Sequence, residues 1–380
     1  MRCGLFSATL LVLCLQGVGT SSSFAEPQED LRALYEKGAD LLDGYQGERE
    51  VLTEAETYFQ KIIQQDPDSP YGPLGISRMY REVAHRYGNT FDETLLREKA
   101  LPLALEAKRL GPDVADVHAA LASIYAPLKQ LSEAKAAVNE ALRLDPNSAR
   151  CQLVLGQVLA YEDKVSEAAA QYERALTRPA SPKLQVGVLS RLAHCYKALG
   201  NSQKAIEVFN RGLALQGKSP WLYNDLGTLY IDLGEYEKAI EVLTRAVELG
   251  LPVSQYNLSI AKGQLDFRLG LSSYNENKLE EARVYFERVV ALAPATAAKS
   301  YDYLSLIAEK FEGAYQKALQ YAEQEIKADP RSPSGYYQAG RVLRLSGQKE
   351  RAMEYFRKCL ELDPESRWSV AIKRTMPELR

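Results

Sequence analysis

Apolar and small residues recur along this chain at helical spacings. A small residue, most often alanine, is followed four positions later by a bulky residue and seven positions later by a second small one, as in Ala168, Tyr172 and Ala175. Spacings of four and seven place side chains on one face of a helix. No segment shows the period-two alternation that is typical of a strand. The pattern therefore predicts an all-α protein built from amphipathic helices.

The first alanine of this pattern returns at near-regular intervals of 45, 34, 34, 37, 34, 43, 36 and 34 residues. These marker alanines are Ala55, Ala100, Ala134, Ala168, Ala205, Ala239, Ala282, Ala318 and Ala352. Most are preceded twelve positions earlier by a Leu-small pair such as Leu226-Gly227, and most are followed twelve positions later by a proline such as Pro146. Proline cannot continue a helix. A recurring glycine within a helix, where it costs about 1 kcal/mol relative to alanine, suggests a close helix crossing. Each unit is predicted to be a helix, a short turn and an antiparallel helix, which is the pattern of a helical solenoid.

This pattern resembles the tetratricopeptide repeat family. The best copies span residues 220–252, with Leu226, Gly227, Tyr230, Gly234, Tyr236, Ala239 and Ala246, and residues 333–366, with Tyr336, Gly340, Gly347, Ala352, Phe356 and Pro364. The resemblance covers roughly residues 31–366. It implies a right-handed superhelical solenoid of about nine helix-turn-helix units, whose first helices line a concave groove that binds peptides or protein segments. We assign residues 26–365 to the solenoid and residues 366–380 to a C-terminal capping helix.

Three stretches depart from the repeat. Residues 86–96 and 253–262 are insertions, which we expect to lengthen a helix or to bulge from one face. The unit that ends at Pro330 has Leu304-Ser305 one residue too far from its marker alanine, Ala318.

The first 25 residues have the layout of a cleavable secretory signal. Arg2 precedes an apolar run from Leu5 to Val18, and a small-residue cleavage site follows at Ser23-Phe24-Ala25. The run is shorter than the ~20 residues that span a bilayer. We therefore expect a soluble, extracytoplasmic protein, periplasmic or secreted, with no integral membrane segment after signal cleavage.

Charge and histidine content argue against a nucleic-acid-binding protein and against an enzyme. The net charge of −3 provides no positive field to displace counterions from phosphates, so we expect no nucleic-acid partner. His85, His118 and His194 fall in different units, so we expect no metal site, cofactor or catalytic residue, and no enzyme activity. Cys195 and Cys359 are predicted to be buried thiols.

The family resemblance places the inner-face positions at fixed offsets from each Leu-small pair. The resulting candidate groove residues are Arg150, His194, Trp221, Asn224, Phe267, Tyr274, Tyr337, Arg341 and Arg344. The side chains that line the groove are then small and mildly polar in its N-terminal half. In its C-terminal half they are aromatic and then basic. Aromatic residues and arginines are the usual anchors of protein interfaces. An alternative is that some of these rings pack against the next unit instead.

The sequence thus predicts a non-enzymatic scaffold or adaptor that holds a protein or peptide segment in its groove outside the cytoplasm. The favoured ligand has apolar residues followed by acidic ones. Two alternatives stay open. One is a structural protein that self-associates into a homo-oligomer, and the other is an accessory subunit that positions an enzyme encoded elsewhere.

Overall fold

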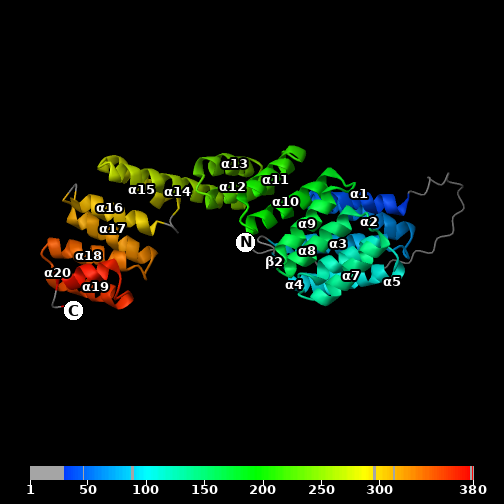
Figure 1. Cartoon of the computed structure of the whole chain (residues 1–380), viewed down its shortest axis with the longest axis horizontal. Coiled ribbons are helices and arrows are strands. Elements are labelled where there is room, and N and C mark those ends of the chain that lie inside the picture. The colour runs from blue at the N-terminus through cyan, green and yellow to red at the C-terminus, as the bar shows by residue number, and fades with distance from the viewer. Residues whose placement is uncertain are drawn as a thin grey trace, which may run out of the picture.

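The computed structural model describes residues 30–45, 47–86, 90–293, 297–310, 313–376 and 379, so the predicted signal at residues 1–25 lies outside the described part. Helices dominate, and consecutive helices pack against each other in pairs along a superhelix (Figure 1). The pairs are α1 (Leu31–Asp43) with α2 (Arg49–Gln65), α3 (Tyr71–Ala84) with α5 (Leu101–Leu110), α6 (Ala115–Tyr125) with α7 (Leu131–Leu144), α8 (Ala149–Tyr161) with α9 (Val165–Leu176), α10 (Pro182–Ala198) with α11 (Ser202–Leu215), α12 (Pro220–Asp232) with α13 (Tyr236–Glu248), α14 (Pro252–Asn275) with α15 (Leu279–Leu292), α16 (Ala298–Lys310) with α17 (Tyr315–Ala328), and α18 (Pro333–Leu345) with α19 (Lys349–Leu362). None of the helices in the described ranges is long and apolar enough to cross a bilayer.

The marker alanines lie in the hydrophobic core along the whole array. Each lies on the second helix of a pair or at its start, and each is fully buried. The second helices end just before the predicted prolines; α7, for example, ends at Leu144, two residues before Pro146. Turns between helices use the predicted glycines, as at Gly234, where φ is +73° and little but glycine is favoured. These predictions from the repeat are confirmed.

The recurring glycines face a bulky side chain. A Cβ atom on Gly227 would fall within 2.7 Å of Leu243 Cδ2 and closer still to Cγ, and Leu243 is the bulky residue four positions after Ala239. Gly156 meets Tyr172, Gly270 meets Phe286 and Gly340 meets Phe356 in the same way. The predicted close crossing is therefore real, and the space between the two helices is filled by the bulky member of the repeat.

The first insertion contains a short strand pair within the otherwise helical fold. Residues His85–Arg86 (β1) pair with Thr90–Phe91 (β2) as a short antiparallel ladder, followed by α4 (Glu93–Leu95) and the π-helical turn η1 (Leu96–Ala100). The sequence pattern could not reveal it because a two-residue ladder is too short to show alternation. The second insertion lengthens α14 to 24 residues, as expected.

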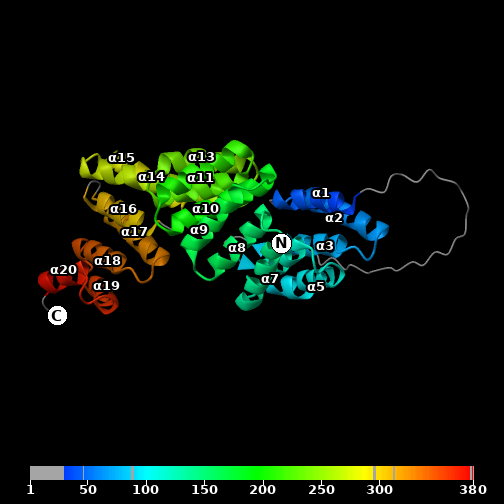
Figure 2. The same cartoon turned by 45° about the vertical axis from the view of Figure 1, so that its right-hand side comes forward.

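The N-terminal half of the superhelix curls back on itself. Helix α1 contacts α10, the first helix of the fifth pair. Asp43 of α1 binds Arg150 of α8, and Asp40 binds Lys183 of α10 at 3.3 Å. We call the closed arrangement of α1–α10 the N-terminal ring. The later helices, yellow to red, extend away from it (Figures 1 and 2).

A short helix, α20 (Arg367–Thr375), packs on α18 and α19 at the end of the array. Its Ile372 is fully buried, and its Trp368 stacks on Tyr337 with ring centroids 4.8 Å apart. This helix covers apolar surface of the α18–α19 pair, as a capping element of a solenoid does.

Candidate partner-binding face

The predicted groove residues all lie on first helices of their pairs, but their surroundings differ. Arg150 is engaged within the N-terminal ring, where its guanidinium donates to both carboxylate oxygens of Asp43 at 2.7 and 2.6 Å. His194 is half-exposed on α10, with Nε2 3.5 Å from the Asp225 carboxylate, and Trp221 is half-buried on α12. The first half of the predicted groove is thus largely occupied by contacts within the protein.

The structure corrects the prediction for Asn224. It was expected on the groove surface, yet it is fully buried. Its Oδ1 accepts hydrogen bonds from Ser254 Oγ at 3.0 Å and from Asn257 Nδ2 at 2.8 Å. The 24-residue helix α14 supplies both donors. The second insertion therefore makes Asn224 part of a hydrogen-bonded contact between α12 and α14.

The C-terminal half brings several predicted rings together. Phe267 and Tyr274 of α14 pack against Tyr303 of α16, with ring centroids 6.2 and 5.1 Å apart. Tyr303 stacks on the buried Phe286, with 4.9 Å between centroids and 14° between planes. Phe267, Tyr274 and Tyr303 keep part of their surface exposed. We call Phe267, Tyr274, Phe286 and Tyr303 the aromatic cluster.

Sequence reasoning missed Tyr303 for two reasons: the groove offsets were not counted in this unit, whose Leu-small pair is out of register, and Tyr303 lies two positions before Ser305, at none of those offsets. The available signal is Ser305, whose hydroxyl donates to the backbone carbonyl of marker alanine Ala318 at 2.8 Å. Ser305 is therefore the small residue of this unit. The groove offsets counted from it select Asp302 and Glu309, which lie on the same helix as Tyr303.

These two acids engage the next helix. Arg341 of α18 donates to Glu309 Oε1 at 2.7 Å and to the Gln338 side-chain oxygen at 2.8 and 3.1 Å. Gln338 in turn donates to Asp302 at 2.6 Å. Arg341 is thus largely neutralised within the protein, whereas Arg344, one turn further along, forms no ion pair with any described residue.

The aromatic cluster and this polar network are contiguous. Burial raises the pKa of Tyr274, and the charges of Asp302 and Glu309 add to that rise while Arg341 opposes it. Burial also raises the pKa of Asp302. A partly exposed apolar surface is therefore bordered by fixed charges of both signs, which is the composition of a protein interface with an apolar centre and a polar rim.

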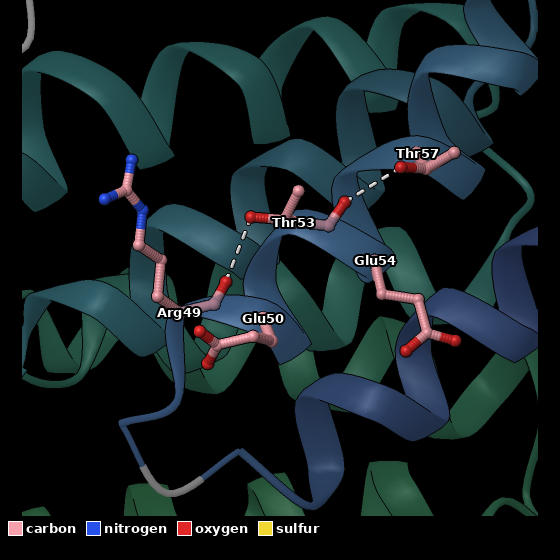
Figure 3. A pocket seen from close by; sticks show the side chains of 5 residues that line it. All are labelled: Arg49, Glu50, Thr53, Glu54 and Thr57. Carbon is pink, nitrogen blue, oxygen red and sulfur yellow. Dashed lines mark hydrogen bonds between the residues drawn. The ribbon is translucent and has the colours of Figure 1, made fainter.

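Two surface hollows elsewhere on the molecule are lined by side chains that are already engaged with neighbouring groups. Figure 3 shows one whose lining side chains all come from α2: Arg49, Glu50, Thr53, Glu54 and Thr57. The Thr53 and Thr57 hydroxyls already donate to backbone carbonyls four residues earlier, at 3.0 and 2.9 Å. A second hollow lies over α14 and is lined by Ile240, Lys262, Leu265, Asp266, Arg288, Ala291 and Leu292, with Asp266 paired to Arg288 at 3.0 Å.

Titratable groups with metal-ligating chemistry are dispersed. Among the described residues, no three His, Cys, Asp or Glu side chains gather as they would around a metal ion. Cys151, Cys195 and Cys359 are free and buried, as predicted for the last two. Burial raises the pKa of the Cys359 thiol to about 11, which keeps it protonated and unreactive at neutral pH.

Comparison with known proteins identifies the repeat. Models described as Tetratricopeptide repeat match residues 115–148, 185–250, 224–297 and 333–366. The chain is 26% identical over 178 residues to the human Protein O-mannosyl-transferase TMTC1, a match that covers 46% of this chain and 19% of that protein. It is 24% identical over 191 residues to the TPR repeat-containing protein MJ1428 of Methanocaldococcus jannaschii, covering 48% of this chain and 32% of that one. The matched segments thus span between a fifth and a third of these relatives.

Solved structures align over most of the chain. A human IFIT1 dimer with m7Gppp-AAAA aligns with a TM-score of 0.49 at 18% identity, covering 88% of this chain and 72% of that one. The APC/C hetero-tetramer Cut9-Hcn1 aligns with a TM-score of 0.43 at 17% identity, covering 90% of this chain and 63% of that one.

Proposed function

The chain belongs to the tetratricopeptide repeat family, and we propose that it is a scaffold that binds a segment of a partner protein along the C-terminal part of its concave face. The observation that carries this proposal is the aromatic cluster. Three of its rings, Phe267, Tyr274 and Tyr303, are partly exposed on the first helices of neighbouring pairs. Large, rigid rings supply much contact area at low entropic cost, so they are suited to anchor a partner.

The closed N-terminal ring supports the choice of this half. Arg150, which would face a ligand there, is already bound to Asp43, and α1 lies against α10. In the C-terminal half, α20 covers part of α18, where Trp368 stacks on Tyr337, while Phe267, Tyr274 and Tyr303 of α14 and α16 stay partly exposed. A segment several residues long therefore has more accessible surface in the C-terminal half.

The charges next to the cluster bear on the partner's sequence. Glu309 engages Arg341, so Arg344 is the cation on this face that remains available for a partner carboxylate. We propose a partner segment with apolar residues that lie on the rings, followed by an acidic residue that reaches Arg344. Rim charges of this kind steer association and are screened by salt.

We propose that this binding takes place outside the cytoplasm and that the protein acts without catalysis. The first part rests on the signal-like residues 1–25, and the second on the general role of this family as interaction scaffolds. An accessory role beside an enzyme draws support from the human relative, whose name describes a transferase.

The test uses the full chain as bait to identify a binder by mass spectrometry, followed by calorimetry with the purified pair. Tyr274→Ala and Tyr303→Ala should each weaken binding about thirtyfold, because loss of an interface anchor typically costs ~2 kcal/mol or more. Tyr256→Ala is the matched control, since Tyr256 lies on the same helix as Tyr274, is 60% exposed and is outside the cluster. Wild-type affinity in both cluster variants, together with loss of binding in His194→Ala, would place the contact in the N-terminal half and refute the proposal.

A further inference from the structure

The second helix of the eighth pair carries a glutamate where other pairs have a small or apolar residue. The position seven residues after the marker alanine is buried in those pairs and is occupied by Ala141, Ala175, Gly212, Ala246, Val289 and Cys359. In α17 the same position is Glu325, whose exposed fraction is 2%. Glutamate is almost never fully buried unless it is paired. The repeat pattern is therefore broken at Glu325 by a buried ionisable group.

This carboxyl group has few polar partners. Its Oε1 accepts a hydrogen bond from Ser332 Oγ at 3.1 Å, and its Oε2 is buried without a hydrogen-bond partner. Within the described ranges no Lys, Arg or His forms an ion pair with Glu325. An ionised carboxylate in such a place loses its hydration without compensation, whereas the neutral acid has no charge to hydrate.

Glu325 lies where the eighth and ninth pairs meet. A Cβ atom on Gly335 of α18 would fall 2.9 Å from Ile326 Cγ1 and 3.4 Å from Glu325 Cδ, so α18 approaches α17 too closely for a further side chain. Three residues further along α18, Gln338 donates to Asp302 of α16 at 2.6 Å. Adjacent positions on one face of α18 thus contact Glu325 and Asp302.

The charges that act most on Glu325 are negative. Burial, then the charge of Asp302 on α16, and further that of Asp329 in the turn after α17, raise the pKa of Glu325 to about 8 against the hydrogen bond from Ser332. The nearby cations Arg341 of α18 and Arg367 of α20 act on Asp302, where they oppose the rise in pKa that burial causes. The helices that pack on α17 therefore bring a second carboxylate toward Glu325.

From this geometry we infer that Glu325 is a pH-sensitive switch at the joint between α17 and α18. The neutral acid lets the two helices pack, and its ionisation releases the last pair, together with α20, from the pair before it. A negative charge at this crossing needs water, and water can reach it only when α18 moves away from α17. Helices α18–α20 are held to the rest of the chain mainly through the contacts of α18 with α16 and α17, so they can separate as one unit.

The switch has a consequence for the aromatic cluster. Tyr303 on α16 and Arg344 on α18 lie on opposite sides of this joint. A partner segment that contacts both would be held at neutral pH and released as the pH rises through about 8. This consequence rests on the proposed scaffold role, whereas the switch itself does not.

The test measures amide hydrogen exchange of the full chain by mass spectrometry at pH 6 and pH 9, corrected for the intrinsic pH dependence of exchange. Protection of α18 should fall at least about tenfold at pH 9 in the wild type, while that of α6–α9 should not. Glu325→Gln should keep α18 equally protected at both pH values. Glu323→Gln is the matched control and should behave like the wild type, because Glu323 lies on the same helix in an exposed contact with Tyr355.

Two further variants keep the inference testable if Glu325→Gln does not fold. Glu325→Ala restores the small residue of the other pairs and should abolish the pH dependence of α18 protection. Asp302→Asn removes the neighbouring charge but keeps an acceptor for Gln338, and it should make the loss of protection at pH 9 smaller. Equal protection of α18 at both pH values in the wild type, or an undiminished loss in Glu325→Ala, would overturn the inference. These measurements involve no partner, so their failure is distinct from a failure of the scaffold proposal.

Discussion

Asp43 and Arg150 stand 107 positions apart in the sequence, yet Arg150 donates to both carboxylate oxygens of Asp43 at 2.7 and 2.6 Å. Arg78 donates to the same carboxylate at 3.0 Å. Burial acts to raise the pKa of Asp43, but the charges and hydrogen bonds of Arg150 and Arg78 outweigh it, so this pKa is lowered. The ion pair joins the first helical pair to the fourth and holds the N-terminal ring closed.

Asp43→Ala should therefore destabilise the protein and open the ring. It removes the carboxylate that pairs with the buried Arg78 and the partly buried Arg150, and breaking a buried ion pair typically costs ~3–5 kcal/mol. Urea unfolding measures the loss, and small-angle scattering should report a larger radius of gyration. Asp40→Ala is the control, because its pair with Lys183 is 40% and 37% exposed and is worth at most about 1 kcal/mol. Equal stability of the two variants would show that Asp43 does not hold the ring.

Glu325 should make stability fall as pH rises toward 8. Burial, and then the negative charge of Asp302, raise its pKa to about 8. Since the folded-state pKa exceeds the unfolded value of about 4.3, its contribution is complete below that value and is lost as pH rises through about 8. The change across this window is at most about 5 kcal/mol.

Glu325→Gln removes this titration, so its melting temperature should vary less between pH 5 and 8 and exceed that of the wild type at pH 8. Glu323→Gln, on the exposed side of the same helix, should retain the wild-type pH profile. A profile of Glu325→Gln that parallels the wild type would exclude Glu325 as the titrating group.

Gly227→Leu should loosen the contact between α12 and α13. The new side chain would compete with Leu243 for the space in which the two helices meet, and overpacking of this kind typically costs ~1–3 kcal/mol. Adding Leu243→Ala should recover part of the loss by making room. Gly187→Ala, another mid-helix glycine but with open surroundings, should be neutral or slightly stabilising. A wild-type melting temperature for Gly227→Leu would contradict the close packing.

Substitution of Arg341 should lower stability, whereas substitution of Arg344 should weaken partner binding. Arg341→Ala leaves Glu309, whose side chain is only 9% exposed, without its partner and should cost about 1–3 kcal/mol in unfolding free energy. Arg344→Ala should change stability by no more than about 0.5 kcal/mol, but it should weaken partner binding and flatten its salt dependence. Unchanged affinity and salt dependence in Arg344→Ala would remove this residue from the interface.

The repeat itself could be predicted from the sequence because each unit uses the same short-range packing. Ala239, Gly227 and Leu243 lie within one helical hairpin, so their spacing alone determines that they meet. The helix ends at the prolines and the turns at glycines are equally local. The inner-face positions of Phe267 and Tyr274 follow from the same offsets, whereas Tyr303 falls at none of them and joins the cluster only through the packing of α16 against α14 and α15.

The closure of the ring and the burial of Asn224 were decided by the tertiary structure. Each depends on contacts between different pairs of helices. The curvature of a superhelix is the sum of small rotations from one unit to the next, and insertions such as β1–β2 and the extended α14 alter those rotations. A 34-residue period encodes how a unit is built, but it contains no information on which distant units come together. Only the accumulated geometry brings Asp43 to Arg150.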